Sequence, residues 1–359
     1  MGLALSLGRR GLGRTWPNPA VGAVIVKNGE IVGRGWTQPG GRPHAEIEAL
    51  RRSGGMARAA TLYVSLEPCS HHGKSPPCAD AVIASGIARV VSTMDDPNPE
   101  VAGRGHARLR SAGIAVDVGI EATTARRDHA GHIRRMRDGR PHVTLKLAIS
   151  ADGKVAGARR QRVAITGNAV RDRVHLMRAH SDAIMIGVGT ALADDPVLTC
   201  RLPGMAKMSP TRVVLDTGLR LPMQSRLLAT AGETPLWIIT GKHAPAASET
   251  AARQRGAEVL RVAEKAGRLD LGEVLKLLAE RGITRLMVEG GQAAASALLE
   301  ADLIDEAVFF HSPIVIGEEG VPALEPRAAK LLDQYLNRVS REPVGPDRQE
   351  MYERGSNHV

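Results

Sequence analysis

Aromatic residues are scarce in this sequence, with three Trp, three Tyr and two Phe among 359 residues. Proteins that grip single-stranded nucleic acid stack its bases on aromatic side chains, so the composition disfavours that class of protein. The hydrophobic cores must instead be built from Val, Ile, Leu, Ala and Met. With 43% hydrophobic and 24% charged residues, the chain otherwise has the composition of a globular protein.

Cysteine is also rare. The sequence contains Cys69, Cys78 and Cys200, too few for a disulfide framework in a chain of this length. Cys200 stands apart from the other two and is interpreted as an ordinary core or loop thiol. No run of eighteen apolar residues predicts a membrane span, and the first 14 residues lack the order of a signal peptide. We therefore expect a cytoplasmic protein with no membrane partner.

The formal net charge of the chain is +10. Such a charge suits either nucleic-acid binding or the binding of phosphorylated small molecules. The basic residues are dispersed, and no run of five or more occurs. We therefore favour phosphorylated small molecules over nucleic acid as partners. Many single arginines would still reflect a general charge bias with no ligand behind it.

The length of the chain exceeds that of one ordinary hydrophobic core and predicts two domains. Residues 21–36 predict a hairpin around Asn28-Gly29, and predicted strands and helices alternate from there to about residue 128. A basic helical stretch then ends at Gly139, and a second alternating series starts at His142. This pattern predicts the α/β class, with domains over residues 1–140 and 141–355.

One short set of His, Glu and Cys residues gives the clearest indication of a chemical function. His44 begins an HAE motif, and Cys69 and Cys78 follow it in the sequence. One imidazole and two thiolates suit Zn²⁺ and leave a fourth position for water. In zinc deaminases the glutamate of the HxE motif is not a ligand but transfers protons during hydrolysis. The sequence therefore predicts a hydrolytic deaminase with Glu46 as its general acid and base.

The spacing of the two cysteines narrows the substrate class. Eight residues separate them, whereas two commonly do so in deaminases that act on nucleotides or nucleic acids. The longer loop contains His71, His72 and Lys74, which suit a phosphate or a polar ring. A nucleic-acid base deaminase with an appended basic domain is therefore disfavoured. Alternatively, His71 or His72 would close the coordination sphere, and the chain would be a non-catalytic binding protein with structural zinc.

Longer motifs extend over nearly the whole chain. In the first half they are PNP at 17–19, HAE at 44–46, LEPCSHHGKSPPC at 66–78, DPNP at 96–99 and VAGRG at 101–105. In the second half they are KLA at 146–148, ITG at 165–167, GVGT at 187–190, ADDP at 193–196, LTCR at 198–201 and VEGG at 288–291. In these motifs the sequence resembles the RibD family of bifunctional riboflavin biosynthesis proteins, which joins a pyrimidine deaminase to a reductase.

The resemblance implies a cytidine-deaminase-like α/β/α domain, followed by a dihydrofolate-reductase-like α/β domain that binds NADPH. His44, Cys69 and Cys78 would hold Zn²⁺, and Glu46 would be the proton shuttle. The implied substrate contacts of the deaminase are Asn18, His71 and Lys74. In some family members a His stands at the position of Thr37.

For the reductase, the resemblance implies two sets of residues. The substrate contacts would be Lys146, Arg162, Arg178, Leu198, Arg201 and Glu289. The cofactor contacts would be Ala148, Ala164, Thr190, Asp194, Thr217, Gly290 and Gly291. Many members have Ser and Trp where this chain has Arg162 and Ala164. A deaminase-only enzyme with an impaired reductase half therefore stays an alternative.

The implied function has two steps. The first domain would hydrolyse the 2-amino group of 2,5-diamino-6-ribosylamino-4(3H)-pyrimidinone 5′-phosphate, with zinc as its cofactor. The second would use NADPH to reduce the ribosyl side chain to a ribityl chain. Both substrates are phosphorylated, which agrees with the positive charge of the chain. The family also suggests a homo-oligomer, either a dimer or a tetramer.

Overall fold

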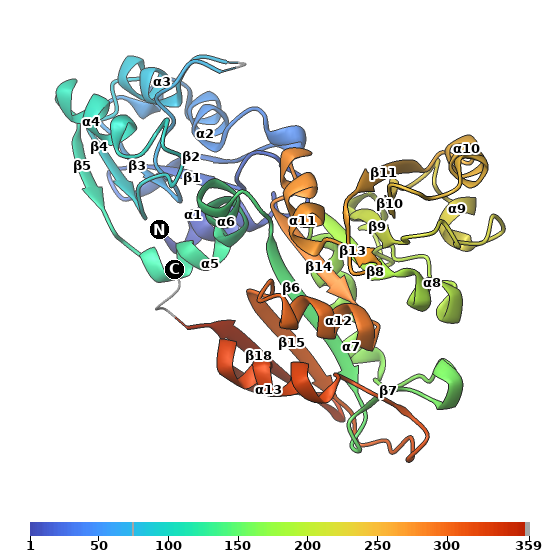
Figure 1. Ribbon diagram of the computed structural model, residues 1–359. Helices are drawn as coiled ribbons and strands as arrows, with labels where there is room; N and C mark the ends of the chain where they lie inside the picture. Colours follow the sequence, from blue (N-terminus) through green and yellow to red (C-terminus); the bar gives the residue numbers. More distant parts are fainter. Residues whose placement is uncertain (74, 356–359) are drawn as a thin grey trace. The chain divides into compact units, whose positions relative to one another are not determined.

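The computed structural model describes residues 1–73 and 75–355. Its internal contacts divide the chain into two compact units, drawn in Figure 1. One comprises Met1–Pro141 with Ala279–Thr284, and the other comprises His142–Leu278 with the chain from Arg285 onward. Both units combine helices with a β-sheet, so the predicted α/β class is confirmed. No helix in the described part of the chain is long and apolar enough to cross a membrane.

The first unit is built on a single sheet. Its strands are β1 (Gly22–Lys27), β2 (Glu30–Trp36), β3 (Thr61–Val64), β4 (Arg89–Ser92) and β5 (Ala115–Val118). Its helices are α1 (Gly2–Arg9), α2 (Ala45–Ser53), α3 (Cys78–Ala84), α4 (Arg104–Ser111), α5 (Ala122–Asp128) and α6 (Ala130–Asp138). Among the described residues the strand order is β2-β1-β3-β4-β5, with β3, β4 and β5 parallel. The segments that follow β3 and β4 therefore leave the same edge of the sheet, where α/β proteins place their ligands.

The core of the first unit holds α2 against this sheet. Ile25 of β1, Leu62 of β3 and Val90 of β4 are fully buried. Ala45 and Ala49 of α2 belong to the same buried cluster. Because these two side chains are small, the helix packs close to the strands, and its first turn is held at a defined place.

The second unit has more elements. Its strands are β6 (His142–Ile149), β7 (Lys154–Ala156), β8 (Ala183–Gly187), β9 (Thr211–Leu215), β10 (Leu236–Gly241), β11 (Glu258–Val262), β12 (Glu264–Lys265), β13 (Arg268–Leu269), β14 (Arg285–Glu289), β15 (Glu306–His311), β16 (Val321–Pro322), β17 (Leu336–Val344) and β18 (Asp347–Arg354). The helices beyond Pro141 are α7 (Asn168–Ala179), α8 (Val188–Asp194), α9 (Arg226–Ala229), α10 (Ala246–Gln254), α11 (Leu271–Glu280), α12 (Gln292–Glu300) and α13 (Pro326–Tyr335).

Nine of these strands form one sheet in the described part of the unit, in the order β11-β10-β9-β8-β14-β6-β15-β18-β17. The strands from β11 to β15 are parallel, and β18 and β17 add an antiparallel hairpin. The sequence pattern does not predict this hairpin. Six of the nine residues of β17 are exposed, because it is an edge strand with little apolar alternation.

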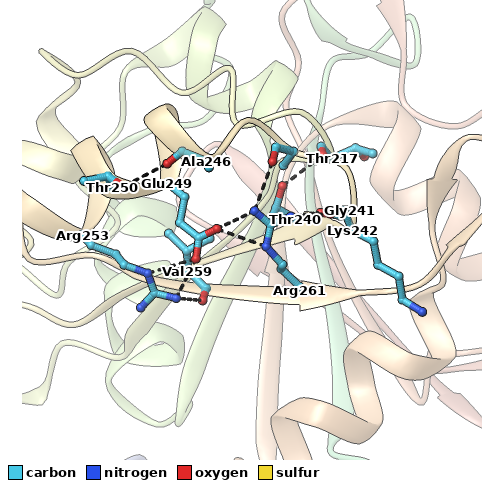
Figure 2. A network of polar contacts seen from close by, with 11 residues as sticks. Thr217, Thr240, Gly241, Lys242, Ala246, Glu249, Thr250, Arg253, Val259 and Arg261 are labelled. Atoms are coloured by element: carbon cyan, nitrogen blue, oxygen red, sulfur yellow. Dashed lines mark hydrogen bonds and ion pairs between the residues drawn. The ribbon is translucent and has the colours of Figure 1, made fainter.

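A network of polar contacts closes the carboxyl end of β10 (Figure 2). Arg261 of β11 donates to the carbonyls of Gly241 at 3.1 Å, Lys242 at 2.6 Å and Ala244 at 3.1 Å. The same guanidinium donates to Glu249 Oε2 through Nε at 3.1 Å and Nη2 at 2.5 Å. Hydrogen bonding to Arg261 is the main cause that lowers the pKa of Glu249. All five N–H groups of the guanidinium are therefore used.

Replacing Arg261 with Lys is expected to lower the melting temperature of the protein by roughly 3–6 °C. Lysine keeps the charge but cannot reproduce the planar fork that reaches three carbonyls and a carboxylate. Thermal unfolding followed by calorimetry measures the effect. Arg255→Lys, on the exposed end of α10, is the matched control and should leave the melting temperature unchanged. Equal melting temperatures for the two variants would contradict a stabilising role for the network.

Candidate active sites

Three sequence-predicted metal ligands converge at the edge of the first sheet. His44 is the residue before α2, Cys78 is the first residue of α3, and Cys69 lies in the loop after β3. His44 Nδ1 lies 3.3 Å from Cys78 Sγ and 3.7 Å from Cys69 Sγ. The three ligand atoms all lie within 4.8 Å of one another. Two helix N-termini therefore meet at this point.

The donor set fits Zn²⁺. With Zn–S near 2.3 Å and Zn–N near 2.05 Å, tetrahedral geometry puts ligand N and S atoms about 3.6 Å apart. The two observed N–S separations, 3.3 and 3.7 Å, lie on either side of that value. Neither His71 nor His72 joins this cluster in the described residues, and both are exposed. The geometry therefore favours three protein ligands with a fourth position left for water.

The two thiols differ in their acidity. Hydrogen bonding to the Cys78 side chain is the main cause that lowers the pKa of Cys69 to about 4, and His44 adds to it. The backbone N–H of Cys78 also donates to Cys69 Sγ at 3.2 Å. The same interaction with Cys69 raises the pKa of Cys78. Metal binding would displace the remaining proton, because both sulfurs coordinate as thiolates.

Glu46 lies in the first turn of α2 and is 3% exposed. Burial raises its pKa to about 7, although His44 acts in the opposite direction. Its carboxyl group also interacts with Cys69 and Cys78. The structure thus brings Glu46 together with all three predicted ligands.

The predicted substrate contacts of the first unit are less closely grouped. Asn18 donates through Nδ2 to the Gly41 carbonyl at 2.8 Å, which ties down the loop before His44. His71 is exposed in the loop between the two cysteines. The prediction for Lys74 lies outside the described residues. Thr37 is buried, and its hydroxyl accepts from the backbone N–H of Val21 at 3.0 Å, so its side chain serves the fold.

Arg42 was not predicted from the sequence, yet it lies beside the metal ligands. Its Nη1 donates to the Ser75 hydroxyl in the loop between the two cysteines. Its positive charge also opposes the raised pKa of His44, which is caused mainly by hydrogen bonding to Cys69. Arg42 stands two residues before His44, and this closeness to a predicted metal ligand was what could have pointed to it in the sequence.

The second unit contains a cavity of about 550 Å³. Its lining includes every residue predicted for the reductase except Thr217: Lys146, Ala148, Arg162, Ala164, Arg178, Thr190, Asp194, Leu198, Arg201, Glu289, Gly290 and Gly291. Thr217 follows β9 and belongs to the network of Figure 2, where its carbonyl accepts from Thr240 Oγ1 at 3.0 Å. The structure therefore gathers all but one of the predicted residues around one cavity.

A buried ion-pair cluster forms one wall of this cavity. Lys146 of β6 and Glu289 of β14 are cross-strand partners, and Lys146 Nζ lies 3.6 Å from Glu289 Oε1. Arg178 of α7 donates to Glu289 Oε2 from Nε at 3.0 Å and from Nη2 at 2.5 Å. Burial would raise the pKa of Glu289, but the charges of Arg178 and Lys146 outweigh it and lower that pKa. Burial also lowers the pKa of Lys146.

Several lining residues were missed by the sequence analysis. They are His175, Arg160, Arg171 and Arg226. His175 lies one helical turn before Arg178 and accepts from the Arg201 N–H at 3.3 Å. Its spacing of three residues from Arg178 was a usable signal. Arg171 lies on the same helix, four residues before His175, and carried the same signal. Arg160 and Arg226 carried none, because they lie in separate segments that only the fold brings together.

Two glycines of the cavity fit the phosphate of a dinucleotide. Gly290 and Gly291 connect β14 to α12, with φ angles of 91° and 79°. A Cβ atom on Gly291 would lie 2.6 Å from Thr190 Oγ1, so only glycine fits here. Gly290, Gly291 and Gln292, at the start of α12, all line the cavity, and the N-terminus of a helix is suited to binding a phosphate. The residues present therefore fit NADPH, although no Trp, Tyr or Phe occurs among the described lining residues.

Replacing Gly291 with Ala is expected to weaken NADPH binding by about tenfold or more. The added methyl group would collide with Thr190 and force the turn out of its left-handed conformation. Isothermal titration with NADPH measures the loss. Gly267→Ala, at an exposed turn with a similar φ of 73° and no neighbour within 4 Å, controls for backbone strain alone. Equal NADPH affinities in the two variants would contradict a cofactor role for this turn.

Comparison with known proteins gives two family matches. Residues 141–342 match the RibD C-terminal domain, and residues 1–94 match the cytidine and deoxycytidylate deaminase zinc-binding region. The riboflavin biosynthesis protein RibD of Escherichia coli (strain K12) is 42% identical over 365 residues, which covers 97% of this chain and 96% of the relative.

Two solved structures are similar over almost their whole length. Acinetobacter baumannii RibD matches with a TM-score of 0.86 and 33% identity, covering 99% of this chain and 98% of that protein. A Thermotoga maritima diaminohydroxyphosphoribosylaminopyrimidine deaminase/5-amino-6-(5-phosphoribosylamino)uracil reductase matches with a TM-score of 0.84 and 32% identity, covering 99% and 97%.

Proposed function

The chain belongs to the RibD family of riboflavin biosynthesis proteins, and from that membership we propose that it catalyses two steps of this pathway. Residues 1–140 would form the zinc-dependent deaminase, and residues 141–355 the NADPH-dependent reductase. The deaminase would hydrolyse the 2-amino group of 2,5-diamino-6-ribosylamino-4(3H)-pyrimidinone 5′-phosphate. The reductase would then convert the ribosyl side chain to ribityl. The observation that carries this proposal is the buried Glu46 beside three ligand atoms within 4.8 Å of one another.

In the deaminase, His44, Cys69 and Cys78 would hold the metal ion. Bound Zn²⁺ would supply Lewis-acid activation of water. Glu46 would accept a proton from that water, deliver it to a nitrogen of the pyrimidine ring and protonate the departing ammonia. Its place in the first turn of α2 supports this role, because the helix fixes the carboxyl group next to the ligand His44.

We further propose that Asn18, His71 and Lys74 contact the phosphorylated pyrimidine. Asn18 would do so at the loop before His44, to which it is hydrogen-bonded. Arg42 would add a positive charge beside the same loop, since the Ser75 hydroxyl holds its guanidinium there.

In the reductase, bound NADPH would supply the hydride for C1 of the opened ribose. Gly290 and Gly291 would bind a cofactor phosphate at the start of α12. Ala148, Ala164, Thr190, Asp194 and Thr217 are the other proposed cofactor contacts.

Arg201 would bind the substrate phosphate through its planar fork. Arg178, whose Nε and Nη2 already donate to Glu289, would add its positive charge and its remaining N–H groups. Arg162 and Leu198 would line the site. Lys146 would interact with the ribosyl group. Glu289 would accept hydrogen bonds from the substrate while it serves as the shared counter-ion of Lys146 and Arg178.

The proposed partners are therefore phosphorylated pyrimidines. We propose no nucleic-acid partner and no membrane partner. A cytoplasmic location stays a prediction, and it suits the thiols of Cys69 and Cys78, which must be reduced to bind a metal. A homo-oligomer also stays a prediction.

A two-step assay on the purified full-length protein tests this function. With the diamino substrate alone, we expect ammonia release; with the deaminated intermediate and NADPH, we expect loss of absorbance at the nicotinamide band. The dephosphorylated substrates serve as matched controls and should react much more slowly. Ammonia release without NADPH oxidation would support the deaminase-only alternative suggested by Arg162 and Ala164. Absence of ammonia release would overturn the proposed deaminase.

A further inference from the structure

The motif DPNPEVAGRG at residues 96–105 has no role in the proposed reaction. It follows β4 and leads into α4. None of its residues belongs to the cluster of His44, Cys69 and Cys78 in the described chain. Its backbone nevertheless lies against the residues that precede Cys69.

One buried side chain organises this segment. Glu67 is 3% exposed. Its Oε2 accepts hydrogen bonds from the N–H groups of Asp96 at 2.9 Å and Gly103 at 2.8 Å. Its Oε1 accepts from those of Gly105 at 2.7 Å and His106 at 3.2 Å. Four backbone donors, spread over eleven residues of chain, thus converge on a single carboxylate, which acts here only as an acceptor.

The segment makes its closest approach at Gly105. A Cβ atom on this residue would lie 2.0 Å from the carbonyl oxygen of Pro68 and 3.0 Å from Glu67 Oε1. Real Cβ atoms do not come this close to a backbone oxygen, so any larger residue must push the Pro68 carbonyl away. Because Pro68 directly precedes Cys69, that displacement would reach the metal ligand.

Two buried histidines also hold the segment. His106 contacts Asp95 Oδ1 through Nδ1 and Ser92 Oγ through Nε2, each at 2.8 Å. His132 of α6 contacts Asp96 Oδ1 through Nε2 at 2.9 Å. The segment is therefore fixed to Glu67, to Ser92 of β4 and to His132 of α6, and it cannot shift without breaking buried hydrogen bonds.

We propose that Glu67 is a positioning residue for the metal centre, which holds residues 96–106 against the Pro68 carbonyl and thereby fixes Cys69. On its other side, Cys69 is held by α3, since its carbonyl accepts from the Ala79 N–H at 3.1 Å. This inference rests on the proposed zinc centre. Metal ligands must be placed within about 0.2 Å of their ideal distances, so a small movement of the Cys69 backbone weakens metal binding.

Glu67→Gln and Gly105→Ala test the inference in the full-length, zinc-loaded protein. In the first variant an acceptor oxygen becomes an NH₂ group that faces two backbone N–H groups. In the second, the methyl group displaces the Pro68 carbonyl. Ser92→Ala is a milder third variant, because it removes one hydrogen bond from His106 and leaves Glu67 in place. Ile25→Ala, a core variant on β1 whose strand partners are Gly33 and Leu62, controls for lost stability.

Zinc affinity, measured by competition with a chromogenic chelator, should fall about tenfold or more in Glu67→Gln and Gly105→Ala. Ser92→Ala should show a smaller loss. The absorption bands of the cobalt-substituted protein should shift in the same variants, because these bands report the thiolate geometry. Ile25→Ala should lower the melting temperature but keep the zinc affinity and the cobalt spectrum of the wild type.

Wild-type zinc affinity and cobalt spectra in the folded Glu67 or Gly105 variants would overturn the inference and leave the zinc centre intact. A loss of affinity as large in Ile25→Ala would overturn it too, since the effect would then follow stability alone. A wild-type protein that binds no stoichiometric zinc would overturn the proposed centre itself. If both stronger variants fail to fold, a wild-type zinc affinity in Ser92→Ala overturns the inference, and a graded loss supports it.

Discussion

Glu46→Gln is expected to lower the turnover of deamination about 10³-fold, while the zinc content and the reductase activity stay at wild-type levels. General acid–base catalysis contributes a factor of about 10²–10⁴, and the described ligand cluster of His44, Cys69 and Cys78 contains no carboxylate that could replace Glu46. Glutamine has nearly the same shape but cannot accept and release the proton. Because Glu46 is not a ligand in this proposal, the metal should remain.

Ammonia release, metal analysis and NADPH oxidation measured on the same preparation check this expectation. Glu48→Gln is the matched control. Glu48 lies on the same helix and pairs with Arg51 and Arg52 at 2.9 and 3.2 Å, away from the ligands. It should lose a little stability and no deaminase turnover. Retention of more than about a tenth of the turnover in Glu46→Gln, or parallel loss of zinc, would contradict the assigned role.

Glu289→Gln is expected to do the reverse of Glu46→Gln: most reductase activity should be lost, while deamination continues. Glu289 is the shared counter-ion of Lys146 and Arg178, and the three side chains are only 11–13% exposed. Removing one member of a buried ion-pair cluster leaves uncompensated charge and costs about 3–5 kcal/mol. We expect kcat/KM for reduction to fall at least ~10²-fold, because Arg178 loses the acceptor that orients it.

The pH dependence of stability gives a second readout for this variant. The pKa of Glu289 is lowered in the folded chain. Its contribution to stability is therefore complete above the unfolded value of about 4.3 and is lost as the pH falls through the folded value. Glu289→Gln should lack this acid-dependent loss. Glu300→Gln, at the exposed end of α12, is the control, and identical behaviour of the two variants would exclude the assigned role.

The metal ligands could be predicted from the sequence because imidazole and thiol groups at this spacing have few other uses. Glu46 followed from its position two residues after His44. Glu67 and Gly105, in contrast, appear in the sequence only as parts of motifs. Their contact depends on the parallel pairing of β3 with β4, which brings the two following segments to one edge of the sheet.

The reductase residues could be predicted only through family resemblance. Composition and spacing alone give little reason to single out Arg178 or Arg201 from the other arginines. His175, which contacts the backbone of Arg201, was missed because a histidine within an amphipathic helix usually belongs to the core. Such contacts arise from the packing of α7 against a distant loop, and local periodicity does not encode that packing.

The lining of the reductase cavity carries six arginines and Lys146 against two acids, Asp194 and Glu289. These cations repel one another: burial and the neighbouring Arg178 and Arg226 lower the pKa of Arg201. A polyanion that enters the cavity relieves this repulsion, so its binding should stabilise the folded protein. The association rate of that polyanion should rise as the ionic strength falls, because electrostatic steering is then screened less. Salt would therefore act on this enzyme as a competitor, slowing the capture of cofactor and intermediate well before it disturbs the fold.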